Sequence, residues 1–354
     1  MNTPDSAVLD DMAARFIRQA DNQFHGYSPL YERLARGAAG DPAVLALAAH
    51  TRPGQIVPLM LFGAVHDLLL SGVEHPLAAY YRSLTAVPRA DGDAYPLFHD
   101  FCLEHWEPIQ HIIATRLVQT NEVGRCAVLL PAFGLVAATA SNQPMALVEI
   151  GASAGLNLLW DRYAYDYGTA GGYGDPAVSP RLACDVRGTV QPPIPVTLPP
   201  IESRVGIDLH PIDVRDPSAA HWLRALIWPE HAARAANLQA AIRIAQAEPP
   251  PLVAGDVLAV LPDVLASVPR DATLCLFHSY VLGQLPQATR DGLAALIADH
   301  GQERDLHLIS IEWLKTPYPR LEWTTYRQGT AEHQVLANCH QHGEWVDWLA
   351  GTPQ

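Results

Sequence analysis

Lysine is almost missing from this chain of 354 residues, because Lys315 is the single lysine among 23 basic residues. The 37 acidic residues give a formal net charge of −14. An acidic surface repels the phosphates of a nucleic-acid backbone, so we do not expect nucleic acid as a partner. Hydrophobic residues make up 49% of the chain, which is typical of a folded globular protein.

Paired cysteines and long apolar stretches are also missing. The five cysteines form no Cys-x-x-Cys pair, which argues against a disulfide scaffold or a cysteine zinc site. The acidic N-terminus shows no secretory signal pattern. The longest apolar run, 126–140, contains Pro131 and Gly134, is too short to span a bilayer and predicts a buried helix. We therefore expect a cytoplasmic protein with reduced thiols and no membrane association.

Residues 1–140 predict a helical N-terminal cap domain. Apolar residues recur at helical spacing between Leu9 and Phe24, and further helices are expected at 56–70, 97–115 and 122–138. Strand patterns are nearly missing from this region. The region therefore has the pattern of a helical domain that packs on another domain.

From Met145 the pattern changes, and residues 141–354 predict an α/β domain with a Rossmann-like doubly wound sheet. Short apolar runs alternate with helical stretches, which is typical of a parallel sheet covered by helices. A glycine- and proline-rich insertion near 163–203 interrupts this rhythm. Strands are predicted at 146–150, 204–209, 252–254, 273–278 and 306–311, with a late antiparallel strand at 335–339. Helices are predicted at 154–162, 218–226, 231–247, 257–265 and 287–300.

The most informative segment runs from Leu147 to Asn157, where an apolar strand leads into Gly151-Ala152-Ser153-Ala154-Gly155. Glycines at such a turn allow a sharp backbone reversal and the close approach of a ligand to the start of the next helix. Nucleotide-binding sheets also carry an acidic residue at the end of the second strand, which accepts from ribose hydroxyls. Asp208 occupies that position.

The same turn matches Gly-x-Ser-x-Gly, the nucleophile elbow of α/β-hydrolases, with Ser153 as the nucleophile. A hydrolase then needs an acid and a histidine after the serine, and Asp305 and His340 stand in that order. A purely structural turn is the third interpretation. The nucleotide-binding interpretation is favoured because Asp208 accompanies the turn, but all three stay open here.

Three segments resemble the motifs of class I S-adenosylmethionine-dependent methyltransferases. Glu149-x-Gly151-x-Ser153-x-Gly155 resembles the first motif, with Ser153 in place of the middle glycine. Val205-Gly206-Ile207-Asp208 resembles the second, and Gly255-Asp256-Val257 the third. The resemblance implies that the S-adenosylmethionine-binding residues are Glu149, Gly151, Ser153, Gly155, Asn157, Asp208 and Asp256.

The whole chain is also similar to a bacterial family of unknown function, domain-of-unknown-function family 2332, through segments such as Thr120–Arg125 and Leu158–Tyr163. This resemblance implies a methyltransferase-like fold. One departure is that Glu149 and Asp208 lie 59 positions apart, against roughly 20 in ordinary Rossmann units. The insertion at 163–203 accounts for the difference if it loops out before the second strand, whereas cofactor binding is in doubt if it covers the cleft.

Outside the motifs, five polar residues are candidates for the reaction. His278 ends a predicted strand, where it can act as a general base, and a core histidine is the alternative. Glu122 and Arg125 are candidate catalytic residues of a lid, the alternative being a helix cap with a surface ion pair. Asn121 and Glu312 are candidate substrate residues. His340 and His342, with His333, could hold a metal, but no carboxylate completes a known pattern, so no metal is expected.

These observations predict methyl transfer from S-adenosylmethionine to an unidentified small molecule. The alternatives are a serine hydrolase acting through Ser153 and a non-catalytic nucleotide-binding protein. For methyl transfer, most of the catalysis is expected to come from positioning the two reactants.

Overall fold

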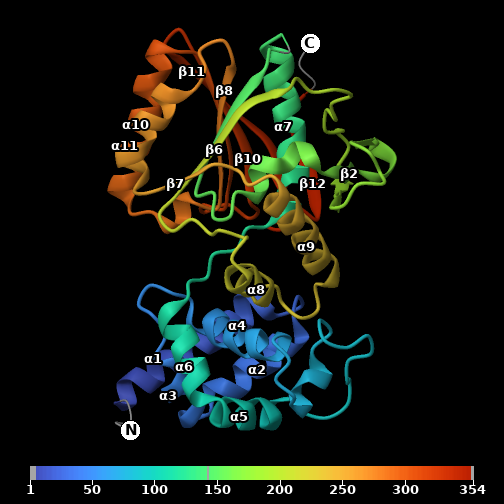
Figure 1. Cartoon of the computed structure of the whole chain (residues 1–354), viewed down its shortest axis with the longest axis vertical. Coiled ribbons are helices and arrows are strands. Elements are labelled where there is room, and N and C mark those ends of the chain that lie inside the picture. Colours follow the sequence, from blue (N-terminus) through green and yellow to red (C-terminus); the bar gives the residue numbers. More distant parts are fainter. Residues whose placement is uncertain (1–4, 142, 352–354) are drawn as a thin grey trace. The chain divides into compact units, whose positions relative to one another are not determined.

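The chain folds into two compact units, as described for residues 5–141 and 143–351 by the computed structural model (Figure 1). The first unit runs up to Thr120 and also takes in Asp216–Ala236. The second unit holds Asn121–Arg215 and the chain from Asn237 onward. The segment around Asn121, which we expected in the helical domain, thus belongs to the unit that contains the sheet.

The first unit is helical and is built around an aromatic core. Phe16, Phe24, Tyr31 and Phe62 form edge-on or tilted ring pairs with centroids 4.8 to 5.9 Å apart, and all four are buried. The predicted helix at 97–115 is two helices, because the chain bends at His105. The helices are α1 (Ser6–Gln19), α2 (Pro29–Ala39), α3 (Pro42–Ala48), α4 (Val57–Leu70), α5 (Tyr95–Glu104), α6 (Trp106–Thr115) and α8 (Pro217–Ala225), with short turns η1 (Ala20–Phe24) and η2 (Pro76–Tyr80).

The second unit has a mostly parallel sheet at its centre, in the order β5-β12-β11-β10-β9-β8-β1-β6-β7. Parallel pairing joins β7, β6, β1, β8 and β9, whereas β10 and β11 add antiparallel strands. The strands are β1 (Met145–Ile150), β5 (Asp185–Arg187), β6 (Ile201–Asp208), β7 (Leu252–Ala254), β8 (Thr273–Ser279), β9 (Leu306–Glu312), β10 (Arg320–Arg327), β11 (Thr330–Cys339) and β12 (Trp345–Trp348). The six predicted strands are all present.

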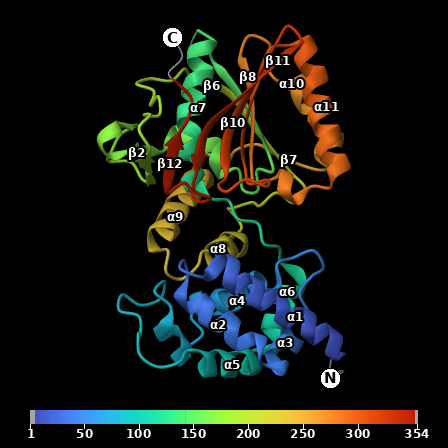
Figure 2. The same cartoon turned by 180° about the vertical axis from the view of Figure 1, so that it is seen from behind.

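Helices cover both faces of this sheet (Figure 2). On one face, Ala146, Val148 and Ile150 of β1 pack in a cluster with residues of α10 (Val257–Ser267) and α11 (Gln287–Glu303). On the other face lies α7 (Cys126–Thr139), whose Phe133 contacts Phe277 of β8 edge-on. Side chains of successive residues in β1 point to opposite faces of the sheet. Glu149, between Val148 and Ile150, therefore points away from α10 and α11. The helix α9 (Ala232–Ala247) carries the chain from the first unit into the second.

The insertion at 163–203 is ordered rather than a simple loop. It forms a small sheet of β2 (Ala164–Asp166), β3 (Gly172–Tyr173) and β4 (Arg181–Ala183), and then β5 joins the edge of the large sheet beside β12. It ends earlier than expected, because β6 begins at Ile201.

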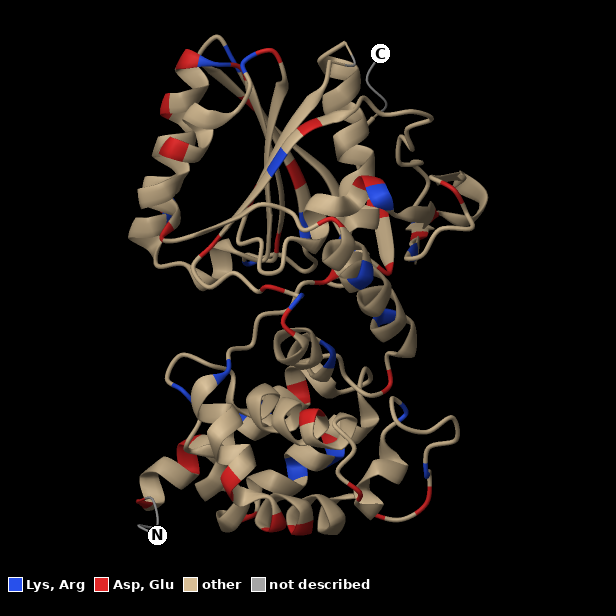
Figure 3. Cartoon of the chain, in the orientation of Figure 1, with Lys and Arg blue, Asp and Glu red and all other residues tan. Residues whose placement is uncertain are grey.

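The fold also shows where the cysteines and the charged residues lie. All five cysteines are free and buried, as expected for reduced thiols. Within the described residues, no helix is long and apolar enough to cross a membrane. Acidic and basic residues are interspersed along the chain in both units (Figure 3).

Candidate functional site

The candidate residues gather at one edge of the large sheet. The parallel strands β1, β6, β8 and β9 all end there, at Ile150, Asp208, Ser279 and Glu312. The strand β11 runs antiparallel to β10, which runs antiparallel to β9, so β11 also ends at this edge. Ligands of open α/β sheets bind outside the carboxyl ends of the strands. This edge is therefore the candidate site.

The glycine turn after β1 adopts three left-handed conformations in alternation. The φ angles are +72° at Gly151, +53° at Ser153 and +69° at Gly155. A Cβ at Gly151 would overlap Val281, and one at Gly155 would overlap Pro250. Both glycines are thus required by backbone conformation and by tight packing of neighbouring side chains.

The backbone N–H groups of this turn bond to acceptors of the protein itself. Gly151 and Ala152 donate to the carbonyl of Ile207 at 2.8 and 3.0 Å, and Gly155 donates to Ala152 at 2.7 Å. Ser153 donates to the Asp208 carboxylate at 2.8 Å. Leu156 donates to the side chain of Asn121 at 2.9 Å. These five donors are therefore already engaged without a ligand.

The expected helix at 154–162 is not an α-helix. Gly155 is left-handed and only a kinked 3-10 segment, η4 (Leu156–Arg162), follows it. Gly155 has a φ of +69° and Leu159 also departs from helical angles, so the α-helical hydrogen bonds are interrupted. The hydroxyls of Tyr163 and Tyr165 donate to the carbonyls of Leu156 and Trp160. A short segment of this kind carries little of the dipole that favours anions at a helix start.

Asp208 lies half-buried at the end of β6 and links the two strands at the centre of the site. One oxygen accepts from the N–H of Ser153, and the other accepts from the N–H of His210 at 2.8 Å. Asp256, which follows β7, is exposed and caps α10 by accepting from the N–H of Leu258 at 2.9 Å. Both acids of the second and third motifs thus stand at the carboxyl edge of the sheet.

Glu149 and Asn157 lie beneath the turn rather than on its surface, each with 1% of its area exposed. The amide of Asn157 donates to Oε1 of Glu149 at 3.4 Å and accepts from the Cys126 thiol at 3.3 Å. Burial raises the pKa of the Glu149 carboxyl well above its usual value, which the nearby Asp208 reinforces and the Asn157 bond opposes. The raised pKa favours the neutral form of the Glu149 carboxyl beneath the turn.

Asn121, Glu122 and Arg125 are buried beside this turn, with 5% to 8% of their area exposed. Glu122 caps the short helix η3 (Val123–Arg125) by accepting from the N–H of Gly124. The Arg125 guanidinium donates to Ser279 at 3.2 Å and lies 4.1 Å from the ring centre of Tyr280. The cluster is thus part of the sheet unit and reaches the ends of β1 and β8.

His278 and Glu312 form a buried pair at the ends of β8 and β9. Nδ1 of the histidine lies 2.8 Å from Oε1 of the carboxylate, which also accepts from the N–H groups of Val281 and Leu282. Burial alone would raise the pKa of Glu312, but these hydrogen bonds outweigh it and hold the pKa below its usual value. An ionised carboxylate fixed in this way orients the imidazole ring.

The hydrolase alternative lacks its expected triad. The buried Oγ of Ser153 has no hydrogen-bond partner among the described residues. Asp305 accepts from the N–H of Gln328, at the opposite end of β11 from His340. The ten residues of β11 span roughly 30 Å, so Asp305 and His340 cannot orient one another.

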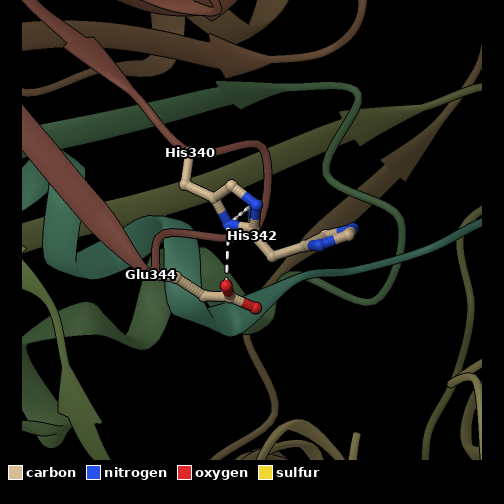
Figure 4. Close-up of side chains that lie close together, drawn as sticks. All are labelled: His340, His342 and Glu344. Atoms are coloured by element: carbon tan, nitrogen blue, oxygen red, sulfur yellow. Dashed lines mark hydrogen bonds and ion pairs between the residues drawn. The ribbon is translucent and has the colours of Figure 1, made fainter. Parts of the chain in front are cut away.

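Sequence reasoning missed two parts of this edge. Tyr280, which packs on Arg125, follows β8 with a positive φ, and an aromatic residue at a strand end carries no distinctive signal. Glu344 lies beside His340 in the turn before β12 (Figure 4). His333 lies farther back on β11 and contacts Thr324 of β10. The alternation of residues 340, 342 and 344 in the sequence is the signal that could have indicated Glu344.

Two surface hollows lie elsewhere on the second unit. One, of about 270 Å³, is lined by Leu159, Arg162 and the prolines 249–251. The other, of about 360 Å³, lies between Trp160, Tyr173 and Leu198. Arg204 borders both and is engaged by Asp161 at 2.7 Å, which leaves its charge balanced.

One known protein family matches nearly the whole chain. Residues 13–348 match the family described as "Uncharacterized protein conserved in bacteria (DUF2332)". The chain belongs to this family. No curated protein and no solved structure is similar enough to count as a match.

Proposed function

We propose that this member of the DUF2332 family transfers a methyl group from S-adenosylmethionine to a small molecule. The observation that carries the proposal is the contact between Ser153 and Asp208. It joins the glycine turn after β1 to the acid after β6, which are the first two motifs of the resemblance. The strand order β7-β6-β1-β8-β9 corresponds to 3-2-1-4-5 of a Rossmann sheet.

The connections of this sheet favour the same place. From β1 the chain goes to β6 on one side and later to β8 on the other, so the order reverses between β1 and β8. Ligands of doubly wound sheets bind at that reversal. The glycine turn lies on one side of it, and His278 and Arg125 lie on the other.

The engaged donors of the turn favour this cofactor over a dinucleotide. A pyrophosphate needs free backbone N–H groups at the turn and a helix start behind it. Here Asp208 and Asn121 accept the N–H groups of Ser153 and Leu156, and an α-helix does not follow. S-adenosylmethionine has no phosphate, and its positively charged sulfonium is compatible with a turn whose central anion is Asp208.

The side chains at the edge have distinct expected roles. Asp208, half-buried, accepts from the ribose hydroxyls, and the exposed Asp256 accepts from the adenine amino group. Arg125 and Tyr280 contact the acceptor molecule on the β8 side. When bound, S-adenosylmethionine supplies an electrophilic methyl group, and its sulfur keeps the electron pair of the broken carbon–sulfur bond.

His278 takes the proton that the acceptor loses as its nucleophilic atom gains the methyl group. Glu312, on Nδ1, then stabilises the protonated ring. Positioning by Asp208 and Arg125 supplies the remainder of the catalysis, because transfer needs the donor and the nucleophile in line.

A labelling experiment tests the reaction. The protein is incubated with S-adenosylmethionine carrying an isotopic methyl group and a small-molecule extract of bacterial cells. We expect label in a small molecule, lost in His278→Ala and kept in the control His307→Asn, which replaces another buried histidine. Cofactor binding with no label in any extract would contradict catalysis, and labelling of Ser153 by a fluorophosphonate would instead support a hydrolase.

A further inference from the structure

We propose that His340, His342 and Glu344 bind one divalent first-row transition-metal ion. Each residue offers one ligand atom, and the three atoms lie within 4.8 Å of one another (Figure 4). None of its three ligands belongs to the glycine turn, and none is Asp208. It therefore goes beyond the proposed function.

The three ligands come from a single turn whose ends are fixed by the sheet. The turn joins β11, which ends at Cys339, to β12, which begins at Trp345. The N–H of His340 donates to Trp345 at 3.0 Å, and the N–H of Gly343 donates to His340 at 3.0 Å. Gly343 has a φ of +77°, which lets the chain reverse between the second and third ligands.

Contacts with the Asn121–Arg125 segment hold this turn in place. A Cβ at Gly343 would overlap the backbone of Gly124, and a Cβ at Gly124 would overlap the carbonyl of His342. Nε of Arg125 donates to the carbonyl of Gln341 at 3.1 Å. The backbone between the ligands is thus held before any metal arrives, which lowers the entropy lost on binding.

The spacing of the ligand atoms suits a metal with short bonds. Nδ1 of His340 lies 3.5 Å from Oε2 of Glu344 and also accepts a long hydrogen bond of 3.4 Å from the backbone N–H of His342. Ligand bonds of roughly 2.0–2.1 Å in a tetrahedral site require about 3.3 Å between ligand atoms. The widest separation must close by about 1.5 Å, within a side-chain rotation. Glu344 is exposed and His342 is half-buried.

The donor set selects the class of metal. Two imidazole nitrogens with one carboxylate oxygen suit Zn²⁺, Co²⁺, Ni²⁺ or Fe²⁺, whereas Ca²⁺ and Mg²⁺ prefer all-oxygen sites. Three protein ligands leave at least one position for water or substrate. Arg125 contacts both this turn and Ser279 at the end of β8. The open coordination position of the metal therefore lies at the same edge of the sheet as His278.

The test uses the full-length protein without a polyhistidine tag, because a tag binds the same metals. Titration calorimetry with Zn²⁺, and visible absorption with Co²⁺, should each give one ion per chain. His342→Ala and Glu344→Gln should weaken Zn²⁺ binding at least tenfold, and Co²⁺ absorption should change in both. The control His333→Ala removes an exposed histidine of β11 and should bind as the wild type does.

Melting temperatures measured without metal show whether each variant is folded. Glu344→Gln changes an exposed side chain and should melt as the wild type does. Absence of stoichiometric Zn²⁺ and Co²⁺ binding by the wild type would overturn the proposal. Equal binding by the wild type and folded Glu344→Gln and His342→Ala would overturn it as well. Neither result bears on S-adenosylmethionine, whose binding is measured separately.

Discussion

The backbone N–H of Ser153 donates to the carboxylate of Asp208 at 2.8 Å, across 55 residues of sequence. The bond couples the turn after β1 to the end of β6 at the centre of the sheet. It sets the turn's central N–H group against a carboxylate of the protein rather than against a bound anion. This bond distinguishes the site from a phosphate cradle, in which the turn's N–H groups contact a bound anion.

Ser153→Gly tests whether the serine is a turn residue or a nucleophile. Ser153 has a φ of +53°, which costs free energy for a residue with a Cβ, and its buried Oγ lacks a partner among the described residues. We expect the free energy of unfolding, measured with urea, to be unchanged or higher by up to roughly 0.5–1 kcal/mol. The variant should keep its cofactor affinity within about tenfold of the wild type. Complete loss of an esterase activity in a folded variant would reverse this assignment.

Glu149→Gln tests the neutral state of the buried acid. Because its folded pKa lies above the unfolded value, the unfolded chain releases this proton first as pH rises from about 4.5. The stability that the group contributes is complete below that pH and is lost as pH rises toward the folded pKa. The slope is at most about 1.4 kcal/mol per pH unit.

We therefore expect Glu149→Gln to become more stable relative to the wild type between pH 5 and pH 8. Urea unfolding of both proteins at the two values measures this difference. Glu202→Gln removes an exposed carboxylate of β6 and serves as the control, with little difference expected at either pH. Equal pH dependence of the wild type and Glu149→Gln would show that Glu149 is ionised in the folded protein.

Glu312→Gln tests the role of the carboxylate behind His278. The amide keeps an oxygen for the N–H groups of Val281 and Leu282 but loses the charge that stabilises a protonated ring. We expect kcat to fall at least tenfold, with KM changed little, whereas His278→Ala should lower kcat by about 10²–10⁴-fold. Measuring both constants on the labelled small molecule decides the point. A fall in affinity alone would make the pair a binding element.

Much of the sheet could be predicted from the sequence, because buried parallel strands are short apolar runs with clear ends. Residues 273–278 were predicted on this basis, and 273–279 form β8. The strand β10 was missed, since Arg320–Arg327 mixes polar and aromatic residues as an antiparallel strand does. Beyond residue 313 only the end of β11 was predicted, at 335–339, and β12 was missed.

The candidate site was less predictable, because its contacts join distant segments. The bond from Leu156 to Asn121 at the start of η4 spans 35 residues, so no local pattern reveals it. The burial of Glu149 depends on Asn157 and Cys126, which no local pattern brings together. Glu344 alternates with His340 and His342 in the sequence, but its position beside His340 also depends on the reversal at Gly343.

Calorimetric titration with S-adenosylhomocysteine, the product of the donor, tests the central claim most directly. We expect one site on the wild type. Asp208→Ala should bind more weakly by about 1.5–3 kcal/mol, or roughly 10- to 150-fold, for one lost charged hydrogen bond. The control Asp213→Ala removes an exposed acid that pairs with Arg215 in the loop after β6, and it should bind as the wild type does. Absence of binding to the wild type, or equal affinity in a folded Asp208→Ala protein, would contradict the account.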